Sequence, residues 1–354
     1  MENMDPMNTY RKHLIGKDAD VRQALQKLND LGIDTILFVV GDDDTLIGAL
    51  TDGDIRRGLL KGLGLENRVH EFSQNSPKVF KRGNYTIEEV MEFRENGLKL
   101  VPFVDDDMRI INIINFRYHK SYLPVDAIIM AGGRGERLKP LTNDLPKPLL
   151  RVGDKPIIEH NLDQLISYGI DNIWISLRYL GKKIENNFKD GSDKNARIKY
   201  IWEDFPLGTV GAASKVEDIE QDYVLIMNSD ILTNLNYEDF FIDFLSKDAA
   251  LSVVTIPYHV TVPYAVLETD NDCLVAFKEK PTYTYFSNGG IYLMKKHCLS
   301  LIPEDTFYNT TDLIEQLIAN GEKVTTYPMV GYWLDIGKHE DFEKAQADIK
   351  HIDF

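Results

Sequence analysis

The stretch from Met130 to Gly153, MAGGRGERLKPLTNDLPKPLLRVG, places three glycines within four positions and follows them with Arg137 and Lys147. Glycine lets backbone N–H groups approach a ligand closely, and arginine presents a fork of donors that matches phosphate oxygens. The rest of the chain is acidic, with a formal net charge of −16 at pH 7. A cationic, glycine-rich segment in such a chain indicates a site for a polyphosphate.

Two common phosphate-binding loops do not fit this segment. A Walker A loop reads GxxxxGK[ST], and the chain contains no such run. A dinucleotide fingerprint reads GxGxxG, but after Gly133 and Gly135 the third position holds Leu138. The glycines alone are also compatible with a plain tight turn, so the interpretation depends on the surrounding sequence.

Apolar runs alternate with amphipathic segments around the glycine loop. Residues 127–131 (AIIMA) are all apolar and directly precede it, as expected for a buried parallel strand. Residues 157–169 place their apolar side chains on one helical face and end at a glycine. Further strands are expected at 172–177, 199–202 and 223–228. This alternation predicts an α/β fold whose parallel sheet is covered on both sides.

Composition excludes several classes of function. The 56 acidic residues outnumber the 40 basic ones, which argues against a nucleic-acid partner because binding phosphate backbones requires a basic face. No apolar run approaches the ~20 residues that span a bilayer, so no membrane partner is expected. Cys273 and Cys298 show no paired metal spacing. The chain is therefore expected to be cytoplasmic.

The first third of the chain contains an internal repeat with an offset of 65 residues. Each copy predicts an amphipathic helix that ends at a glycine, an apolar strand, an acidic turn and a second strand. Two such copies would bury their apolar faces against each other as a pseudo-symmetric α+β pair. The corresponding residues are Leu25, Leu28, Gly32, Ile33, Ile36, Phe38 and Val39 in the first copy and Val90, Phe93, Gly97, Leu98, Val101, Phe103 and Val104 in the second.

The segment IGALTDGDIRRGLL (residues 47–60) resembles the end of a CBS motif, and the two copies together resemble a CBS pair. In that family a Thr or Ser and an Asp three residues on hold ribose hydroxyls of an adenine nucleotide or similar ligand. The resemblance therefore implies a regulatory nucleotide site at Thr51 and Asp54. The second copy has Asn115 and Tyr118 in these places, so one site at most is expected. Alternatively, the aspartates of this segment only cap the following helix.

Residues 131–160, AGGRGERLKPLTNDLPKPLLRVGDKPIIEH, resemble the signature of sugar-1-phosphate nucleotidyltransferases, which reads GGxGTRLxPLT followed by PKP. Glu136 stands where that family usually has Thr. The resemblance covers residues 125–354 and implies a Rossmann-like, mixed and mostly parallel sheet. Further family motifs follow in order: PLGTVGAA (206–213), IMNSD (226–230), FKEKP (277–281), NGGIYLM (288–294) and YWLDIG (332–337).

The two resemblances predict two domains. A CBS pair with a regulatory or dimerisation role is expected at residues 1–122, and a nucleotidyltransferase catalytic domain at residues 125–354. The connection between them, YHKSYLP (118–124), is short. CBS pairs often stack on one another, so the resemblance also implies a homo-oligomer.

The resemblance implies a reaction in which a sugar 1-phosphate oxygen attacks the α-phosphorus of a nucleoside triphosphate and pyrophosphate leaves. Both reactants are polyanions, so the protein must cancel their repulsion and align them. The resemblance assigns Arg137 and Lys147 to catalysis, on the triphosphate and the departing pyrophosphate. It assigns nucleotide binding to Ala131, Gly132, Gly133, Glu203, Gly208 and Thr209.

The resemblance also implies a metal site and a sugar-phosphate site. Asp230 follows an apolar strand, and Asp335 lies in the WLDIG motif; two carboxylates with phosphate oxygens and water suit Mg²⁺. The sugar phosphate is expected at Glu279, Lys280, Asn288 and Gly289.

The base is expected to be guanine. By family alignment Glu203 lies beside the base, and a carboxylate can accept from both the N1–H and N2–H₂ donors of guanine. The overall sequence also resembles glucosamine-, mannose- and heptose-1-phosphate guanylyltransferases. Two alternatives remain open at this point: Glu203 is a solvated loop residue, or the enzyme is a thymidylyl- or uridylyltransferase.

Two other classes of protein fit the sequence less well. A glycosyltransferase that uses nucleotide sugars has no reason to carry the glycine loop together with PKP and EKP. A non-catalytic nucleotide sensor would be expected to lose Arg137, Lys147, Asp230 or Asp335, and all four are present. The sequence therefore favours an enzyme.

Overall fold

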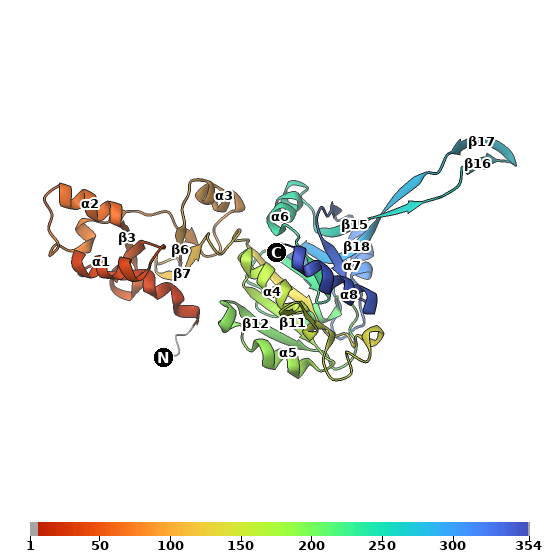
Figure 1. The fold of residues 1–354 in the computed structure, drawn as a ribbon, viewed down its shortest axis with the longest axis horizontal. Helices are drawn as coiled ribbons and strands as arrows, with labels where there is room; N and C mark the ends of the chain where they lie inside the picture. The colour runs from red at the N-terminus through yellow and green to blue at the C-terminus, as the bar shows by residue number, and fades with distance from the viewer. Residues whose placement is uncertain (1–5, 353–354) are drawn as a thin grey trace. The chain divides into compact units, whose positions relative to one another are not determined.

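The computed structural model describes residues 6–352, which form two compact units (Figure 1). The first unit contains the described residues up to Pro124, with segments 165–172 and 189–198. The second contains 125–164, 173–188 and the described residues from Lys199 onward. The domain boundaries expected from the sequence, 1–122 and 125–354, stay a prediction, and their outer ends lie outside the described residues. No described helix is long and apolar enough to cross a membrane.

The first unit contains the expected repeat. In each copy a helix precedes two antiparallel strands, β2 with β3 and β6 with β7. The glycines that end the two helices, Gly32 and Gly97, have φ of +63° and +74°. The strands are β1 (Leu14–Gly16), β2 (Ile36–Val40), β3 (Leu46–Thr51), β4 (Gln74–Asn75), β5 (Phe80–Lys81), β6 (Leu100–Val104) and β7 (Ile110–Asn115), and the helices are α1 (Val21–Asp30), α2 (Asp52–Leu60) and α3 (Ile87–Glu95).

The two copies share one hydrophobic core, which confirms the pseudo-symmetric arrangement. The backbone N–H of Leu46 in the first copy donates to the carbonyl of Met108 in the second, at 2.9 Å. In the first copy α2 follows β3, whereas no helix follows β7 in this described part of the chain. The shared core consists of Leu14, Phe38, Val40 and Leu46 from the first copy and Leu100, Val104, Ile110 and Ile113 from the second.

The second unit is built on a seven-stranded mixed sheet with the order β12-β11-β8-β13-β18-β15-β19. The pairs β11–β8, β13–β8 and β15–β19 are parallel, while β18 runs antiparallel to both β13 and β15. Its strands are β8 (Val125–Met130), β11 (Asn172–Leu177), β12 (Arg197–Trp202), β13 (Tyr223–Asn228), β15 (Leu251–Thr261), β18 (Thr282–Lys295) and β19 (Val324–Pro328). Short pairs are formed by β9 (Arg151–Val152) with β10 (Lys155–Pro156) and by β14 (Ile231–Thr233) with β20 (Trp333–Asp335).

Both faces of the central strands are buried, as the all-apolar runs predict. Ile128 packs in one cluster with Leu313 and Leu317 of α7. Its neighbours Ala127 and Ile129, which point to the opposite face, have no exposed surface either. The helices are α4 (Ile157–Ser167), α5 (Gly181–Phe188), α6 (Tyr237–Ser246), α7 (Thr310–Ala319) and α8 (His339–Asp348).

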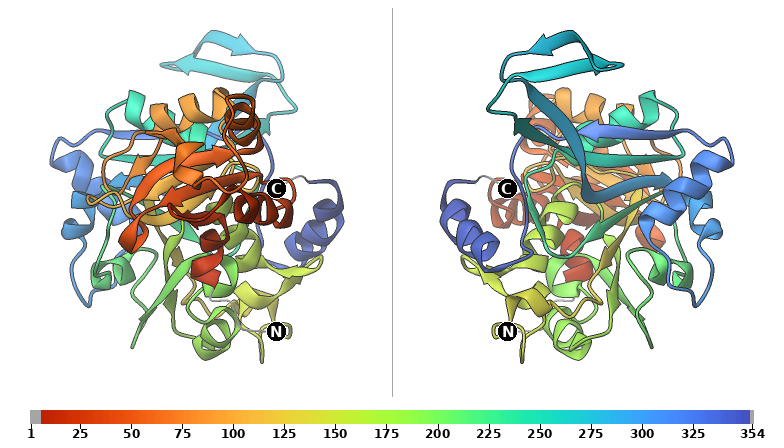
Figure 2. Two further views of the ribbon diagram at one scale, coloured as in Figure 1. Left: turned by 90° about the vertical axis from the view of Figure 1, so that its left-hand side faces the viewer. Right: turned by 90° about the vertical axis from the view of Figure 1, so that its right-hand side faces the viewer.

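Strands β15 and β18 continue beyond the sheet as a two-stranded ribbon (Figures 1 and 2). The hairpin of β16 (Val266–Asp270) and β17 (Cys273–Lys278) forms its tip. The pairing of β15 with β18 changes register between Val253 and Thr255, just before the ribbon begins. We call residues 256–287 the arm.

Candidate active site

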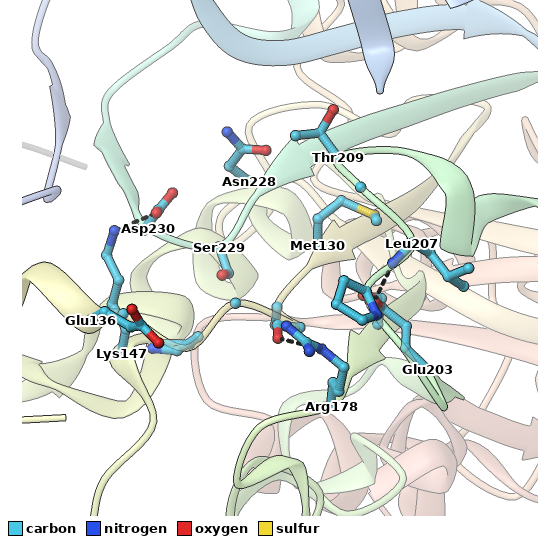
Figure 3. A pocket seen from close by; sticks show the side chains of 18 of the residues that line it. Met130, Glu136, Lys147, Arg178, Glu203, Leu207, Thr209, Asn228, Ser229 and Asp230 are labelled. Carbon is cyan, nitrogen blue, oxygen red and sulfur yellow. Dashed lines mark hydrogen bonds and ion pairs between the residues drawn. The ribbon is translucent and has the colours of Figure 1, made fainter. Parts of the chain in front are cut away.

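A pocket of about 400 Å³ lies at the carboxyl ends of β8, β11 and β13, where ligands bind in open α/β sheets (Figure 3). Met130 ends β8, Ser176 lies one residue before the end of β11, and Asn228 ends β13. Figure 3 places Lys147 and Asp230 at one end of the pocket and Glu203 at the other. The predicted residues that line the pocket are Ala131, Gly132, Gly133, Arg137, Lys147, Glu203, Gly208, Thr209 and Asp230.

Two glycines of the loop are required by close contacts. Gly135 has φ of +61°, and a Cβ there would lie 3.0 Å from Cβ of Lys147. A Cβ at Gly132 would lie 2.5 Å from Oε1 of Glu203, closer than real Cβ contacts come. The backbone therefore passes directly over Lys147 at one point and Glu203 at another. Gly133 has open space around it, so its backbone is free to face a ligand.

Lys147 is a buried cation held by two carboxylates. It is 8% exposed, and its Nζ forms an ion pair with Asp230 Oδ2 and lies 3.9 Å from Asp335 Oδ1. The two aspartates lie on adjacent segments, because β14 pairs with β20 and the N–H of Ile336 donates to the carbonyl of Asp230 at 3.0 Å. A buried charge is stable only when it is paired, so this trio is one electrostatic unit.

The two aspartates fit a hard divalent cation. Oδ1 of Asp230 is buried and has no hydrogen-bond partner, which leaves one carboxylate oxygen unsatisfied. Burial, and then the negative charge of Asp230, raise the pKa of Asp335. A cation beside both carboxylates would give the unsatisfied oxygen of Asp230 a partner and would stabilise the ionised form of Asp335. Oxygen ligands are those that Mg²⁺ prefers. Among the described residues no group of three or more His, Cys, Asp and Glu side chains is placed to hold a metal, so protein ligation here would come from two.

Glu203 is buried at the opposite end of the pocket, so the alternative that it is a solvated loop residue is wrong. Its exposed fraction is 8%. Ser176 donates its hydroxyl to Oε1 at 2.5 Å, and the N–H of Leu207 donates to Oε2 at 3.3 Å. A carboxylate offers about four lone-pair sites, so two remain for a ligand.

The loop at Gly208 and Thr209 is fixed to the start of α7. The hydroxyl of Thr209 accepts from the N–H of Thr310 at 2.8 Å, and the N–H of Thr209 donates to Asn309 Oδ1 at 3.3 Å. Both predicted residues therefore line the pocket on a supported loop.

None of the four residues expected at the sugar phosphate lines this pocket. The side chain of Asn288 donates to the hydroxyl of Tyr292 at 2.8 Å, and the carbonyl of Gly289 accepts from Trp333 Nε1 at 2.9 Å. Glu279 and Lys280 are exposed on the arm. Their role in sugar-phosphate binding stays a prediction.

Thr51 and Asp54 form a helix cap. Thr51 is the N-cap of α2, and Asp54 completes a capping box with it, which confirms that Asp54 caps the helix. Both oxygens of the buried Asp54 carboxylate accept hydrogen bonds: Oδ2 from Thr51, and Oδ1 from Arg57 at 2.5 Å and Gln74 at 2.8 Å. A regulatory ligand at these residues would have to exchange some of these bonds, and that site stays a prediction.

Sequence reasoning missed several residues of the pocket. Arg178 donates from Nε to the carbonyl of Gly132 at 3.3 Å, and Ser176 and Asn228 also line the pocket. All three stand at or just past the carboxyl end of a predicted strand, and that position alone could have identified them. Phe307 could not have been found this way, because it reaches the pocket from the loop before α7.

Comparison with known proteins agrees with this fold. Residues 126–352 match the nucleotidyl transferase family, and residues 12–61 match the CBS domain. The chain therefore belongs to the nucleotidyl transferase family, and it carries a CBS domain before the matched region.

Relatives of the chain include guanylyl- and uridylyltransferases. A mannose-1-phosphate guanylyltransferase of Mycobacterium tuberculosis is 30% identical over 233 residues, 64% of each chain. A D-glycero-alpha-D-manno-heptose 1-phosphate guanylyltransferase of Aneurinibacillus thermoaerophilus is 31% identical over 232 residues, 64% of this chain and 99% of the relative. A UTP–glucose-1-phosphate uridylyltransferase of Synechocystis is 28% identical over 239 residues, 62% of each chain. This chain thus spans less than two thirds of the first and third relatives.

A solved structure, HddC from Yersinia pseudotuberculosis complexed with GMP-PN, is 27% identical to this chain. It superposes with a TM-score of 0.50 and covers 63% of this chain and 99% of the other. The matched part corresponds in extent to the nucleotidyl transferase region.

Proposed function

We propose that the protein transfers a nucleotidyl group from a nucleoside triphosphate to a sugar 1-phosphate and releases pyrophosphate. The observation that carries this proposal is the buried Lys147 between Asp230 and Asp335, at the same end of a pocket as the glycine loop. A polyphosphate needs cations and open backbone N–H groups, and this end of the pocket offers both.

The residues of the pocket divide the work between two ends. Arg137 and Lys147 neutralise the triphosphate and the charge that develops on pyrophosphate, which lowers the barrier without a covalent intermediate. The loop at Gly132 and Gly133 fixes the position of the phosphates. Glu203, at the far end, holds the base, and the loop at Gly208 and Thr209 closes that side. Alignment of the two anionic reactants is then the main contribution of the protein.

Mg²⁺ is the cation that we propose for Asp230 and Asp335. When bound, it supplies positive charge to the phosphate oxygens of the reacting nucleotide. The chain's own part is to hold two carboxylates on the paired strands β14 and β20 and to keep Lys147 beside them.

GTP is the donor that the environment of Glu203 favours. Its carboxylate is anchored by Ser176 and Leu207 and still has acceptor sites for two adjacent donors, as guanine N1–H and N2–H₂ provide. Thymine and uracil offer one N–H donor beside a carbonyl. A carboxylate can accept from that N–H, but it has no hydrogen to donate to the carbonyl. The similarity to two guanylyltransferases and to HddC, which forms a complex with GMP-PN, supports this choice. The uridylyltransferase relative makes UTP the second candidate.

The remaining assignments belong to the same proposal. The sugar phosphate is bound by Glu279, Lys280, Asn288 and Gly289. Residues 1–122 act as a regulatory CBS pair, and this pair receives a nucleotide at Thr51 and Asp54. The proposed location is the cytoplasm, where nucleoside triphosphates are available and both described cysteines can remain the free thiols found here.

Pyrophosphate release tests the reaction. The full chain is incubated with Mg²⁺, each of the common nucleoside triphosphates and a panel of sugar 1-phosphates, and release should require both substrates. Arg137→Ala should lower kcat about 10²-fold or more, because it removes charge stabilisation from the transition state. Arg134→Ala is the matched control, because Arg134 stands in the same loop but outside the pocket lining. If Arg137→Ala only raises KM, the catalytic role of Arg137 is wrong.

A further inference from the structure

The arm presents an exposed apolar face. The register places Tyr258 opposite Tyr285 and Val260 opposite Tyr283, so these four side chains share one face of the ribbon. Tyr258 is 61% exposed and Tyr285 59%. On the opposite face only the pair Pro257–Phe286 next to the sheet is apolar; beyond it His259 contacts Thr284 at 3.0 Å, and the Thr261 and Thr282 hydroxyls lie 3.0 Å apart. A ribbon with one apolar and one polar face is the pattern of a strand pair that is covered on one side.

The tip of the arm repeats this division. Leu267 lies opposite Phe277, and they are 60% and 65% exposed. On the opposite face, Lys278 and Glu268 belong to the two flanking cross-strand pairs, and they form an ion pair at 2.8 Å. An isolated two-stranded ribbon is only marginally stable in water, and large exposed apolar patches mark protein interfaces. The exposed apolar side chains of the arm therefore favour a surface that covers them.

The base of the arm adjoins the pocket, but its tip does not. A Cβ at Gly290 would lie 2.7 Å from the side-chain nitrogen of Asn228, which lines the pocket. From the pair Thr255–Asn288 to the pair Thr261–Thr282 the ribbon runs six residues further, about 20 Å at the usual rise per residue. Lys280 lies beyond that point. While the ribbon is paired, Lys280 cannot reach the pocket of its own chain.

The rim of the pocket offers the missing surface on another copy. Phe307 lines the pocket and is 59% exposed, and Phe205, next to the pocket-lining Pro206, is 44% exposed. Like the tyrosine side chains of the arm, these side chains are aromatic and exposed, so the two surfaces could pack together. The glycine loop of the pocket can receive an anion, and Lys280 of the arm would add a cation to those already in the lining.

We propose that two copies of the chain exchange arms, so that the apolar face of each arm packs at the Phe205–Phe307 rim of the other copy. The Glu279–Lys280 turn of one copy then completes the sugar-phosphate end of the partner pocket. In a two-fold symmetric pair, the same contact occurs twice, so that both arms are covered and both pockets are completed. This inference rests on the proposed nucleotidyl transfer, because it assigns Lys280 to the same site.

The mass of the full chain in solution tests the contact without any assay of activity. The double variant Tyr258→Thr/Tyr285→Thr removes the apolar face and keeps strand-forming residues; it should raise the dissociation constant of the pair at least about tenfold, measured by light scattering over a dilution series. The control His259→Thr/Thr284→Ser changes the opposite face and should keep the wild-type mass. A monomeric wild-type protein, or an unchanged dissociation constant for the tyrosine variant, would overturn the exchange.

Complementation tests the shared site. Arg137→Ala removes the pocket cation and Lys280→Ala removes the arm cation, so each variant alone should be nearly inactive at low sugar 1-phosphate. When the two are co-expressed with different tags, the purified mixed pair should regain activity at one of its two sites, about half of the wild-type value per pair. Mixed pairs that stay inactive while the wild type is active would contradict the exchange. A wild type inactive with every substrate would instead refute the proposed function and leave the mass measurement to decide on the arm.

Discussion

The backbone of Gly132 lies against the carboxylate of Glu203, so closely that a Cβ at Gly132 would come within 2.5 Å of Oε1. The glycine loop and the buried glutamate come from different strands, β8 and β12, and meet only in the fold. The contact joins the part of the pocket that faces phosphates to the part that we assign to the base. It can be tested directly, because the neighbouring Gly133 offers a control.

Gly132→Ala should destabilise the protein even without a nucleotide. The added methyl group must displace a carboxylate that is buried and hydrogen-bonded, and overpacking of this kind typically costs about 1–3 kcal/mol. Thermal unfolding of the ligand-free protein should show a decrease of a few degrees. Gly133→Ala should leave the unfolding temperature unchanged, because a Cβ there meets no atom within 4 Å. Equal unfolding temperatures for the two variants would show that Glu203 is not held against the loop.

Glu203→Gln should reduce the preference for GTP. An amide presents one donor and one acceptor, so it loses one of the two bonds to guanine and gains one to uracil or thymine. We expect the ratio of kcat/KM for GTP over UTP to fall about tenfold, which corresponds to about 1.4 kcal/mol. Ser176→Ala should act in the same direction but more weakly, because it only frees Oε1 of Glu203 to move. An unchanged ratio in both variants would place the base elsewhere.

Asp230→Asn should reduce activity steeply and restore part of it at high Mg²⁺. The substitution keeps the shape of the side chain but removes a charged oxygen ligand beside Lys147 and Asp335. Activity is measured against Mg²⁺ concentration for the wild type and the variant. Glu340→Gln is the control, since Glu340 is an exposed carboxylate outside the pocket. Full wild-type activity in EDTA would refute the metal site.

Asp54 should make the first unit more sensitive to acid. Burial raises the pKa of its carboxyl, but hydrogen bonds from Thr51, Gln74 and Arg57 together outweigh it and bring the pKa below 3.8. The carboxylate therefore stabilises the fold fully above pH 3.8, and this contribution is lost as the pH falls through the lowered value. Asp54→Asn should weaken hydrogen-exchange protection of α2 at neutral pH, and the difference from wild type should shrink below pH 3.8. A difference that is independent of pH would mean that the charge of Asp54 is not what stabilises the helix.

The sequence predicts the central sheet well because its strands are continuous apolar runs. The expected strands at 172–177 and 223–228 coincide with β11 and β13, and the glycine loop leaves β8 as expected. Local patterns fix such elements, since both faces of a central parallel strand must be apolar.

The parts that the sequence does not predict depend on contacts between distant segments. The burial of Glu203 depends on Ser176, 27 residues earlier, and on the turn that brings back Leu207. The pairing of Lys147 with Asp230 joins residues 83 apart. The alternating apolar residues of the arm are visible in the sequence, but the register that carries Lys280 away from the pocket is set by pairing across the whole ribbon.

The fate of the α-phosphorus tests the central claim most directly. The full chain is given GTP labelled at the α-phosphate, a sugar 1-phosphate, Mg²⁺ and equal concentrations of unlabelled UTP and dTTP. We predict that the label enters a GDP-sugar, that unlabelled pyrophosphate forms in equal amount, and that GTP is consumed at least about tenfold faster than its competitors. Label that appears in GMP or GDP independently of the sugar 1-phosphate would contradict nucleotidyl transfer, and faster consumption of UTP or dTTP would contradict the assignment of the base.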